Sequence, residues 1–414
     1  MLTFLIIILC LEILLVFKIV KFYVLSQVHL YLLFYLGTII LTSLYYYHYD
    51  DKISLYRFDY IKEGLFIETI KLHLFALVAF LAGVIVYYDL SRKSKKLIFN
   101  KSFSKVLFYK FNLPEKINIV IIVLFLIILI LYASTYGLRI FYREDYLISD
   151  GRAIQTITKL LSFVLSILLA FNYTTNRAHS IVTFSMLLLL TIGTGSRIAF
   201  LYFVIYVFLI FQSQGNTIKN KLILFVNLIL AFLLLSFIMS LRIGESHGVF
   251  PYLAKIFDSK DEFTESLSFN IYYSFIFGIF VSAKTILLNV PDWNNIIVSL
   301  NPLTGKMAGW YDIAESMRIY PIVPYSSNGE VFTMGNSFTF LFYLILGCIV
   351  SHFDYKTRNL FAHGKRILGF IIVILFLLYV VYSFEYNLRS SFRYIYYIYI
   401  LLFVFSIKLK KIRV

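Results

Sequence analysis

The sequence predicts an all-α polytopic membrane protein with about 11–12 transmembrane helices, one re-entrant element and a large outward-facing loop region. Of its 414 residues, 60% are hydrophobic and 14% are charged, whereas soluble domains average about 45–50% and about 25%. The apolar residues gather in runs of about 20, the length that crosses a bilayer. Because no polar stretch is long enough to enclose a core of its own, we expect a single integral membrane domain over residues 1–414.

The apolar runs define the expected helices in order. They predict spans at 2–19, 28–47, 69–88, 117–137, 157–173, 179–195, 197–212, 221–241, 337–352, 367–384 and 393–408. The first run has neither the basic region nor the cleavage site of a signal peptide, so we expect it to be retained as a helix. Segment 269–288 is a different case, because it carries Lys284 and is followed by Pro291.

The charges of the loops set the expected orientation. Loop 89–116 is rich in lysine and arginine, whereas loop 48–68 is mainly acidic, so we expect the first in the cytoplasm and the second outside. If 269–288 crossed the membrane, the basic loop 353–366 would lie outside. We therefore expect 269–288 to be re-entrant and residues 242–336 to form one outward-facing region, where protein covers any irregular backbone.

The net charge of +16 does not indicate a nucleic-acid partner. Much of it lies in "SRKSKKLIFNKSFSKVLFYK" and in the tail "KLKKIRV", and both segments flank apolar runs. This placement is typical of loops beside transmembrane helices, and the chain has no folded basic module. The expected partner is thus the lipid bilayer and not nucleic acid. Cys10 and Cys348 lie in different runs and predict neither a disulfide framework nor a metal site.

The turn "TGSR" between two close spans is the first candidate site. Glycines there allow a tight turn, and the next helix begins with free N–H groups and a positive dipole. Together with Ser196 and the guanidinium of Arg197, they would bind an anion. The alternative is an arginine that extends to the lipid headgroups.

Two later stretches carry further candidates. "MSLRIGESHGVF" ends a long span with Arg242 and continues with Glu245 and His247, which could exchange a proton or be ordinary loop residues. The outward loop then contains Arg318, two prolines that favour extended chain, and Glu330 just before a helix. Its aromatic residues could anchor the membrane interface or support sugar rings.

Arginine also recurs at other expected outward helix ends. Arg139 and Arg143 follow "LYASTYGL", and Arg389 and Arg393 lie in "EYNLRSSFRY". Arginine near outward helix ends should be rare, so its recurrence predicts a shared anionic ligand. Arginine rather than lysine suits bidentate recognition of phosphate.

The combination of "TGSR" between close spans, "LRIG" at the end of a later span and "PYSSNGEVFTMG" leading into a helix resembles the Wzy-type oligosaccharide repeat-unit polymerases. These enzymes make bacterial O-antigen and capsule. The resemblance implies a glycosyltransferase in the bacterial inner (plasma) membrane that joins undecaprenyl-pyrophosphate-linked oligosaccharides at the outer face. It implies no metal and no cofactor, and a chain-length regulator protein as a further candidate partner.

The chemistry of such a transfer fits the candidate residues. Breaking the bond from C1 to pyrophosphate gives an oxocarbenium-like transition state, and arginines would neutralise the departing charge. The acceptor hydroxyl needs a base, for which Glu330 is the first choice and Glu245 or His247 the second. The sequence leaves two alternative functions open: an O-antigen ligase, and a lipid-linked oligosaccharide flippase or other transporter.

Overall fold

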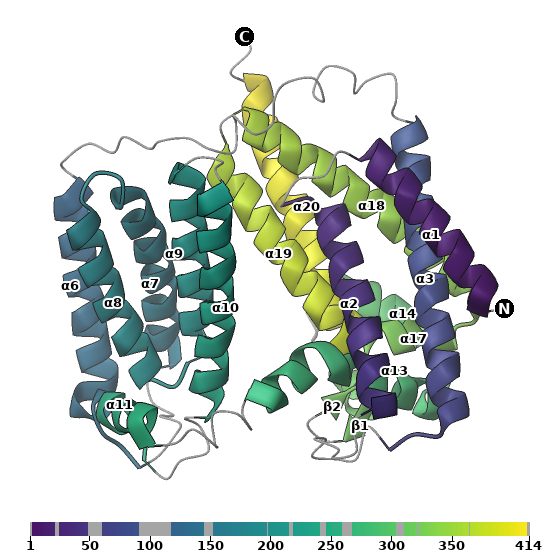
Figure 1. Ribbon diagram of the computed structural model, residues 1–414, viewed down its shortest axis with the longest axis horizontal. Coiled ribbons are helices and arrows are strands. Elements are labelled where there is room, and N and C mark those ends of the chain that lie inside the picture. Colours follow the sequence, from purple (N-terminus) through teal and green to yellow (C-terminus); the bar gives the residue numbers. More distant parts are fainter. Residues whose placement is uncertain are drawn as a thin grey trace. The chain divides into compact units, whose positions relative to one another are not determined.

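The structure of the protein is a computed structural model that describes much of the chain. The described residues are 2–20, 25–48, 60–90, 117–144, 152–196, 198–214, 218–240, 246–258, 267–303, 310–320, 323–363 and 365–411. They are overwhelmingly helical, as predicted from the apolar runs (Figure 1).

The chain divides into two compact units, and each is described by itself. Unit 1 comprises residues 1–103 and 271–414, and unit 2 comprises residues 104–270. The elements of unit 1 are α1 (Leu2–Ile19), α2 (Gln27–His48), α3 (Glu63–Leu90), the π-helical η2 (Tyr272–Ile276), α13 (Phe277–Leu288), α14 (Trp293–Leu300), α16 (Trp310–Ser316), β1 (Arg318–Tyr320), β2 (Val323–Pro324), α17 (Ser327–Thr333), α18 (Asn336–Ala362), α19 (Arg366–Glu385) and α20 (Leu388–Lys411). Those of unit 2 are α6 (Ile117–Tyr136), the 3-10 helix η1 (Gly137–Ile140), α7 (Arg152–Asn172), α8 (Arg177–Gly193), α9 (Ile198–Gln214), α10 (Ile218–Ser240) and α11 (Val249–Asp258). The predicted outward region, 242–336, is thus shared between the two units.

The chain is a multi-pass membrane protein. Seven helices of the described chain are long and apolar enough to cross a membrane: Gln27–His48, Glu63–Leu90, Ile117–Ile140, Ala153–Asn172, Leu267–Leu288, Asn336–Phe361 and Leu368–Glu385. Three shorter apolar helices, Arg177–Gly193, Ile198–Phe211 and Leu222–Ala231, accompany them. Each run from which we predicted a span corresponds to a helix, which confirms the all-α polytopic class.

The structure does not support the predicted re-entrant element at 269–288. This segment belongs to one continuous helix, Leu267–Leu288, in which η2 leads directly into α13. Pro291 follows the end of the helix and so does not interrupt it. Lys284 is only half-buried. The sequence prediction gave both residues too much weight as signs of a re-entrant element. A proline beyond the last turn and a lysine near a helix end are both compatible with an unbroken helix.

Glycine permits an unusually close contact between α3 and α18. A Cβ atom added to Gly83 would lie 2.0 Å from the carbonyl oxygen of Leu344, and one added to Gly347 would lie 2.1 Å from that of Phe80. The Cys348 thiol also donates to the Gly83 carbonyl at 3.2 Å. Small residues that let two backbones approach are a principal source of helix association in membranes. The contact between α3 and α18 is therefore a principal packing contact of unit 1.

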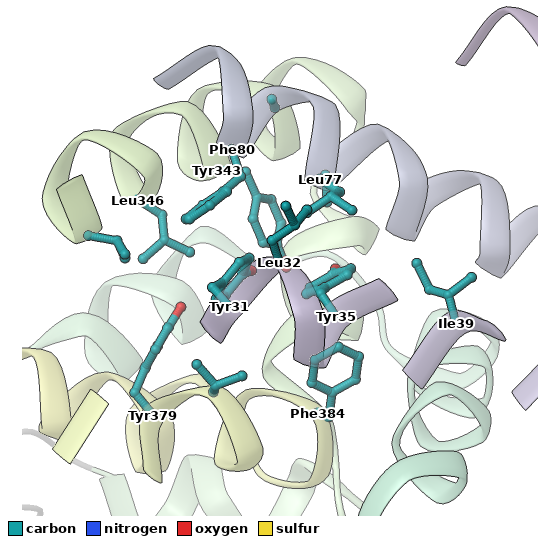
Figure 2. Close-up of a cluster of buried hydrophobic side chains, with 14 of the residues drawn as sticks. Tyr31, Leu32, Tyr35, Ile39, Leu77, Phe80, Tyr343, Leu346, Tyr379 and Phe384 are labelled. Atoms are coloured by element: carbon teal, nitrogen blue, oxygen red, sulfur yellow. The ribbon is translucent and has the colours of Figure 1, made fainter. Parts of the chain in front are cut away.

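Aromatic side chains fill the space beside this contact (Figure 2). Tyr31 of α2 stacks on Phe80 of α3 with ring centroids 4.1 Å apart. Tyr35, one turn later, meets Phe384 of α19 edge-on at 4.9 Å. Tyr343 of α18 lies in the same buried cluster. The core of unit 1 is therefore made by helices from both ends of the sequence.

Candidate functional site

Three predicted patches of unit 2 meet at one end of its helices. The backbones of Arg143 and His247 pair as an antiparallel bridge, with N–H···O distances of 2.8 and 2.7 Å. Gly248 adopts a φ of +123°, and a Cβ atom there would lie 2.6 Å from the backbone of Phe141. Glycine is needed for this close pairing. A Cβ on Gly193, at the end of α8, would in turn lie 3.2 Å from the carbonyl oxygen of Ile140.

Arg143 is the central side chain of this cluster. It is only 5% exposed, and its Nη1 donates to the carbonyl oxygens of Gly193 at 2.8 Å and of Arg139 at 3.3 Å. Its Nε and Nη2 are buried and have no hydrogen-bond partner among the described residues. A buried, unpaired donor is costly, and a guanidinium with two such nitrogens is suited to a bidentate anion.

The predicted tight turn after α8 is confirmed. Gly195 has a φ of +70°, and its N–H donates to the carbonyl of Ile192 at 2.7 Å. The Ser196 carbonyl accepts from Ala199 N at 3.2 Å and so starts α9. A small pocket beside the turn has a volume of about 10 Å³ and is lined by Ser196, Thr194, Tyr136, Lys159 and others. This volume fits one water molecule.

His247 and Arg139 differ sharply in exposure. His247 is 3% exposed, and its Nδ1 shares a hydrogen bond of 3.0 Å with the hydroxyl of Tyr252. Arg139 lies on η1 and is exposed. The structure therefore brings Arg139, Arg143, His247 and the turn of Ser196 together, with Arg139 at the surface of the group.

In unit 1 the predicted loop before α18 contains a short buried helix, α17. Ser326 caps it, because its Oγ accepts from Gly329 N at 2.9 Å and also shares a 2.9 Å hydrogen bond with Ser282 of α13. Thr285 Oγ1 accepts from Ser326 N at 3.1 Å. A Cβ atom on Gly329 would lie 2.5 Å from Thr285 Cβ. The start of α17 is thus docked tightly on α13.

Glu330 lies in the middle of α17 and has no exposed surface. Both of its carboxylate oxygens are 3.4 Å from Leu388 N, at the start of α20. Burial raises the pKa of this carboxyl to about 8, and the hydrogen bond from Leu388 lowers it in part. The sequence predicted a base at this position, and the structure adds that its carboxyl is completely enclosed.

Arg389 follows directly after Leu388, but its guanidinium has a different environment. Nη1 donates to the carbonyls of Val298 at 2.9 Å and Asn301 at 3.0 Å, and Nη2 donates to that of Leu303. Its Cζ lies 5.3 Å from the centre of the Trp310 ring. Arg389 therefore binds the carbonyls at and beyond the end of α14, as cations do at helix C-termini. We predicted it as a phosphate-binding residue, and in this structure most of its donors serve the fold.

The remaining predicted residues are more peripheral or are not described. Arg318 is exposed on β1, which pairs with β2, and its Nε donates to Ala314 O at 3.3 Å. Arg197, Arg242 and Glu245 lie outside the described residues. In the part of the chain that the structure describes, no group of three or more His, Cys, Asp or Glu residues could hold a metal ion.

Several residues that organise α17 were not predicted. Asn328 accepts a hydrogen bond of 2.7 Å from the Tyr343 hydroxyl, and His73 contacts Phe332 edge-on at 4.9 Å. A histidine inside a predicted span is itself a signal of function or of a specific partner, and His73 lies within 69–88. The pattern Ser327-x-x-Glu330 also resembles a helix start and could have indicated α17, although the residue that caps the helix is Ser326.

No protein-family model, curated protein or solved structure matches this chain.

Proposed function

We propose that this protein polymerises lipid-linked oligosaccharide repeat units into O-antigen or capsular polysaccharide, by glycosyl transfer at the outer face of a bacterial inner membrane. The observation that carries the proposal is Arg143, a buried guanidinium with two nitrogens that have no partner among the described residues. It lies beside the turn that ends in Ser196. A pyrophosphate group offers the paired oxygens that such a fork binds.

The reaction assigns a role to each group. The bond from C1 of the donor glycan to pyrophosphate oxygen breaks, and the oxygen of the acceptor hydroxyl bonds to C1. The hydroxyl proton goes to a base, and the undecaprenyl pyrophosphate leaves with the electron pair of the broken bond. Arg143 and the more exposed Arg139 stabilise the charge on the leaving group.

Glu330, in unit 1, is the proposed base, and this assignment rests on its own surroundings alone. A carboxyl with a pKa of about 8 binds a proton more strongly than an ordinary carboxylate, which favours proton transfer from a sugar hydroxyl. Since Glu330 is fully buried in this structure, base catalysis requires that the acceptor gain access to it. Glu330→Gln retains the size of the side chain and removes this function.

Transport of a lipid-linked oligosaccharide is the second candidate. It is favoured by the buried, protonatable Glu330 and by His73 inside a membrane-spanning helix, since ionisable residues at such depth are typical of transport pathways. The two functions predict different defects in a deletion strain of the source organism. Loss of a polymerase leaves single repeat units on the cell surface, whereas loss of a flippase leaves intermediates inside.

The direct test uses purified protein with lipid-linked repeat units and measures product length. We expect Arg143→Ala and Glu330→Gln each to reduce long products at least 100-fold, the order seen when one preorganised donor is removed. Arg143→Lys should be nearly as poor, because it lacks the guanidinium fork. Arg177→Ala is the matched control, since Arg177 is exposed at the other end of α8. Wild-type product length from Arg143→Ala would remove the anion site from the mechanism.

A further inference from the structure

Two buried hydrogen bonds connect helices of unit 1 beside α17. The Nδ1 of His73 on α3 and the hydroxyl of Tyr35 on α2 are 2.8 Å apart. The Tyr343 hydroxyl on α18 donates to Asn328 Oδ1 on α17 at 2.7 Å. All four side chains are at most 2% exposed. Figure 2 shows the two tyrosines among the buried aromatic residues.

The donor is fixed in the bond to α17, because an amide oxygen accepts only and the hydroxyl proton of Tyr343 therefore goes to Asn328. The Nε2 of His73 is buried without a partner among the described residues, so a neutral ring avoids an uncompensated buried charge.

Tyr343 and His73 both contact one face of α17. Asn328 and Phe332 are four residues apart and thus share that face. Tyr343 binds it at Asn328, and His73, which is hydrogen-bonded to Tyr35, contacts it at Phe332. Glu330 is two positions from each of Asn328 and Phe332. At about 100° per residue it lies about 160–200° around the helix, which is the side of Leu388 and α20.

We infer that His73, Tyr35 and Tyr343 are positioning residues that fix the rotation of α17 and so keep Glu330 enclosed against the start of α20. A helix of seven residues is not stable without tertiary contacts. An apolar face alone tolerates rotation, whereas the hydrogen bond from Tyr343 to Asn328 is satisfied in one orientation only. The catalytic meaning of this arrangement rests on the proposed function, but the arrangement itself does not.

The test measures the enclosure of Glu330 without any substrate. Dicyclohexylcarbodiimide enters apolar surroundings and reacts with a protonated carboxyl. The O–H adds across one C=N bond, and the acyl group then migrates to nitrogen, giving a stable N-acylurea with no leaving group. Peptide mass spectrometry of the full-length protein from pH 5 to pH 10 gives the midpoint of labelling at Glu330. We expect the wild-type midpoint near pH 8.

Other charged or titratable groups near α17 are kept unchanged in this comparison. The elements packed against α17 carry Lys284 on α13, Tyr343 on α18, Glu385 on α19 and Arg389 on α20, and Tyr325 precedes it. Of these groups, only Tyr343 is substituted in the test. Labelling of Glu12 on α1, whose Oε2 is also buried, provides an internal reference within each sample.

Three variants decide the inference. Tyr343→Phe removes the hydrogen bond to Asn328, and His73→Leu removes the partner of Tyr35 and the ring contact with Phe332. Both should lower the Glu330 midpoint by at least one pH unit, a tenfold change in proton affinity. His73→Asn keeps a hydrogen-bonding group near the position of Nδ1 and should remain within about 0.3 unit of wild type. Tyr379→Phe, a buried tyrosine of the same cluster that takes no part in these two hydrogen bonds, is the matched control.

Two results would overturn the inference. One is a wild-type midpoint in folded Tyr343→Phe and His73→Leu, and the other is an equal shift in His73→Asn and His73→Leu. If His73→Leu does not accumulate, Tyr35→Phe removes a single oxygen and gives the same test. Because labelling needs no glycan, a failed polymerase assay leaves this result intact, and a failed labelling result leaves the proposed reaction to its own test.

Discussion

Arg143 and Arg389 are both deeply buried arginines, yet the structure uses them differently. Arg389, in unit 1, donates to three backbone carbonyls and lies over the Trp310 ring, and one nitrogen, Nε, has no partner among the described residues. Arg143, in unit 2, donates through Nη1. Its other two nitrogens, Nε and Nη2, have no partner among the described residues. Both arginines were predicted to bind the same anionic ligand.

The difference shows that the burial of an arginine does not identify an anion site. What distinguishes the two is the share of donors already engaged by the backbone. A guanidinium that binds the carbonyls at the end of a helix acts as a cap, whereas one with an unsatisfied edge retains capacity for a further acceptor. We therefore expect substitution of Arg389 to reduce stability and substitution of Arg143 to reduce ligand binding.

The largest expected effect is a loss of stability in Arg389→Ala. The substitution leaves the carbonyls of Val298, Asn301 and Leu303 without their donor, which should lower the free energy of unfolding by about 3–5 kcal/mol. Thermal unfolding of the purified protein in detergent measures this loss. Arg393→Ala is the control, because Arg393 is exposed one turn later on α20 and should change stability by less than about 0.5 kcal/mol. Equal melting temperatures for the two variants would refute the structural role of Arg389.

The next effect concerns Glu330 and depends on pH. Its pKa is about 8 in the folded protein, against an ordinary value of 4.5. Between these values the folded state holds a proton that the unfolded state has lost, so stability falls as pH rises through this window and is constant below it. The stability advantage of Glu330→Gln over wild type should therefore grow by about 2 kcal/mol from pH 6 to pH 8.

Melting curves at the two pH values test this prediction. Glu315→Gln serves as the control, because Glu315 is exposed on α16 and should show no such trend. An advantage of Glu330→Gln that is the same at both pH values would mean that Glu330 is ionised in the folded protein.

The smallest of these effects sharpens the comparison at Arg143. Inorganic pyrophosphate at about ten times its dissociation constant should stabilise the wild-type protein by about 1.4 kcal/mol. Arg143→Ala should lose this stabilisation, whereas Arg389→Lys, if folded, should retain it. Thermal shifts with and without pyrophosphate measure both. Should Arg143→Ala respond as wild type does, pyrophosphate binds elsewhere and the contrast between the two arginines does not extend to ligands.

The sequence predicted the helices well because an apolar run of sufficient length has few alternatives in a membrane. It predicted the turn at Gly195 for a similarly local reason, since glycine there permits a positive φ. By contrast, the bridge between Arg143 and His247 joins positions about 100 residues apart, and no local pattern indicates such a partner. Residue type alone also could not distinguish Arg389 from Arg143, because their roles depend on which carbonyls lie within reach.

The candidate site in unit 1 was predicted only in part. Glu330 was identified from its position before a helix, but the short helix that carries it is held by Ser282, Thr285 and Tyr343, which come from two other helices. The prediction of a re-entrant element at 269–288 was not supported, for a different reason. Lys284 and Pro291 were given more weight than the apolar length of Leu267–Leu288, which is the stronger determinant of a continuous helix.

The glycine contact between α3 and α18 bears on how the protein is made. Gly83 and Cys348 are 265 residues apart in the chain, and the whole of unit 2 is synthesised between them. After α3 enters the membrane, its glycine face therefore remains unpaired until the intervening helices and α18 are inserted. Unit 1 is completed only near the end of translation, so a ribosome that stops before α18 leaves a nascent chain whose first helices lack their principal partner. Quality control of membrane insertion should recognise such a chain by that exposed face.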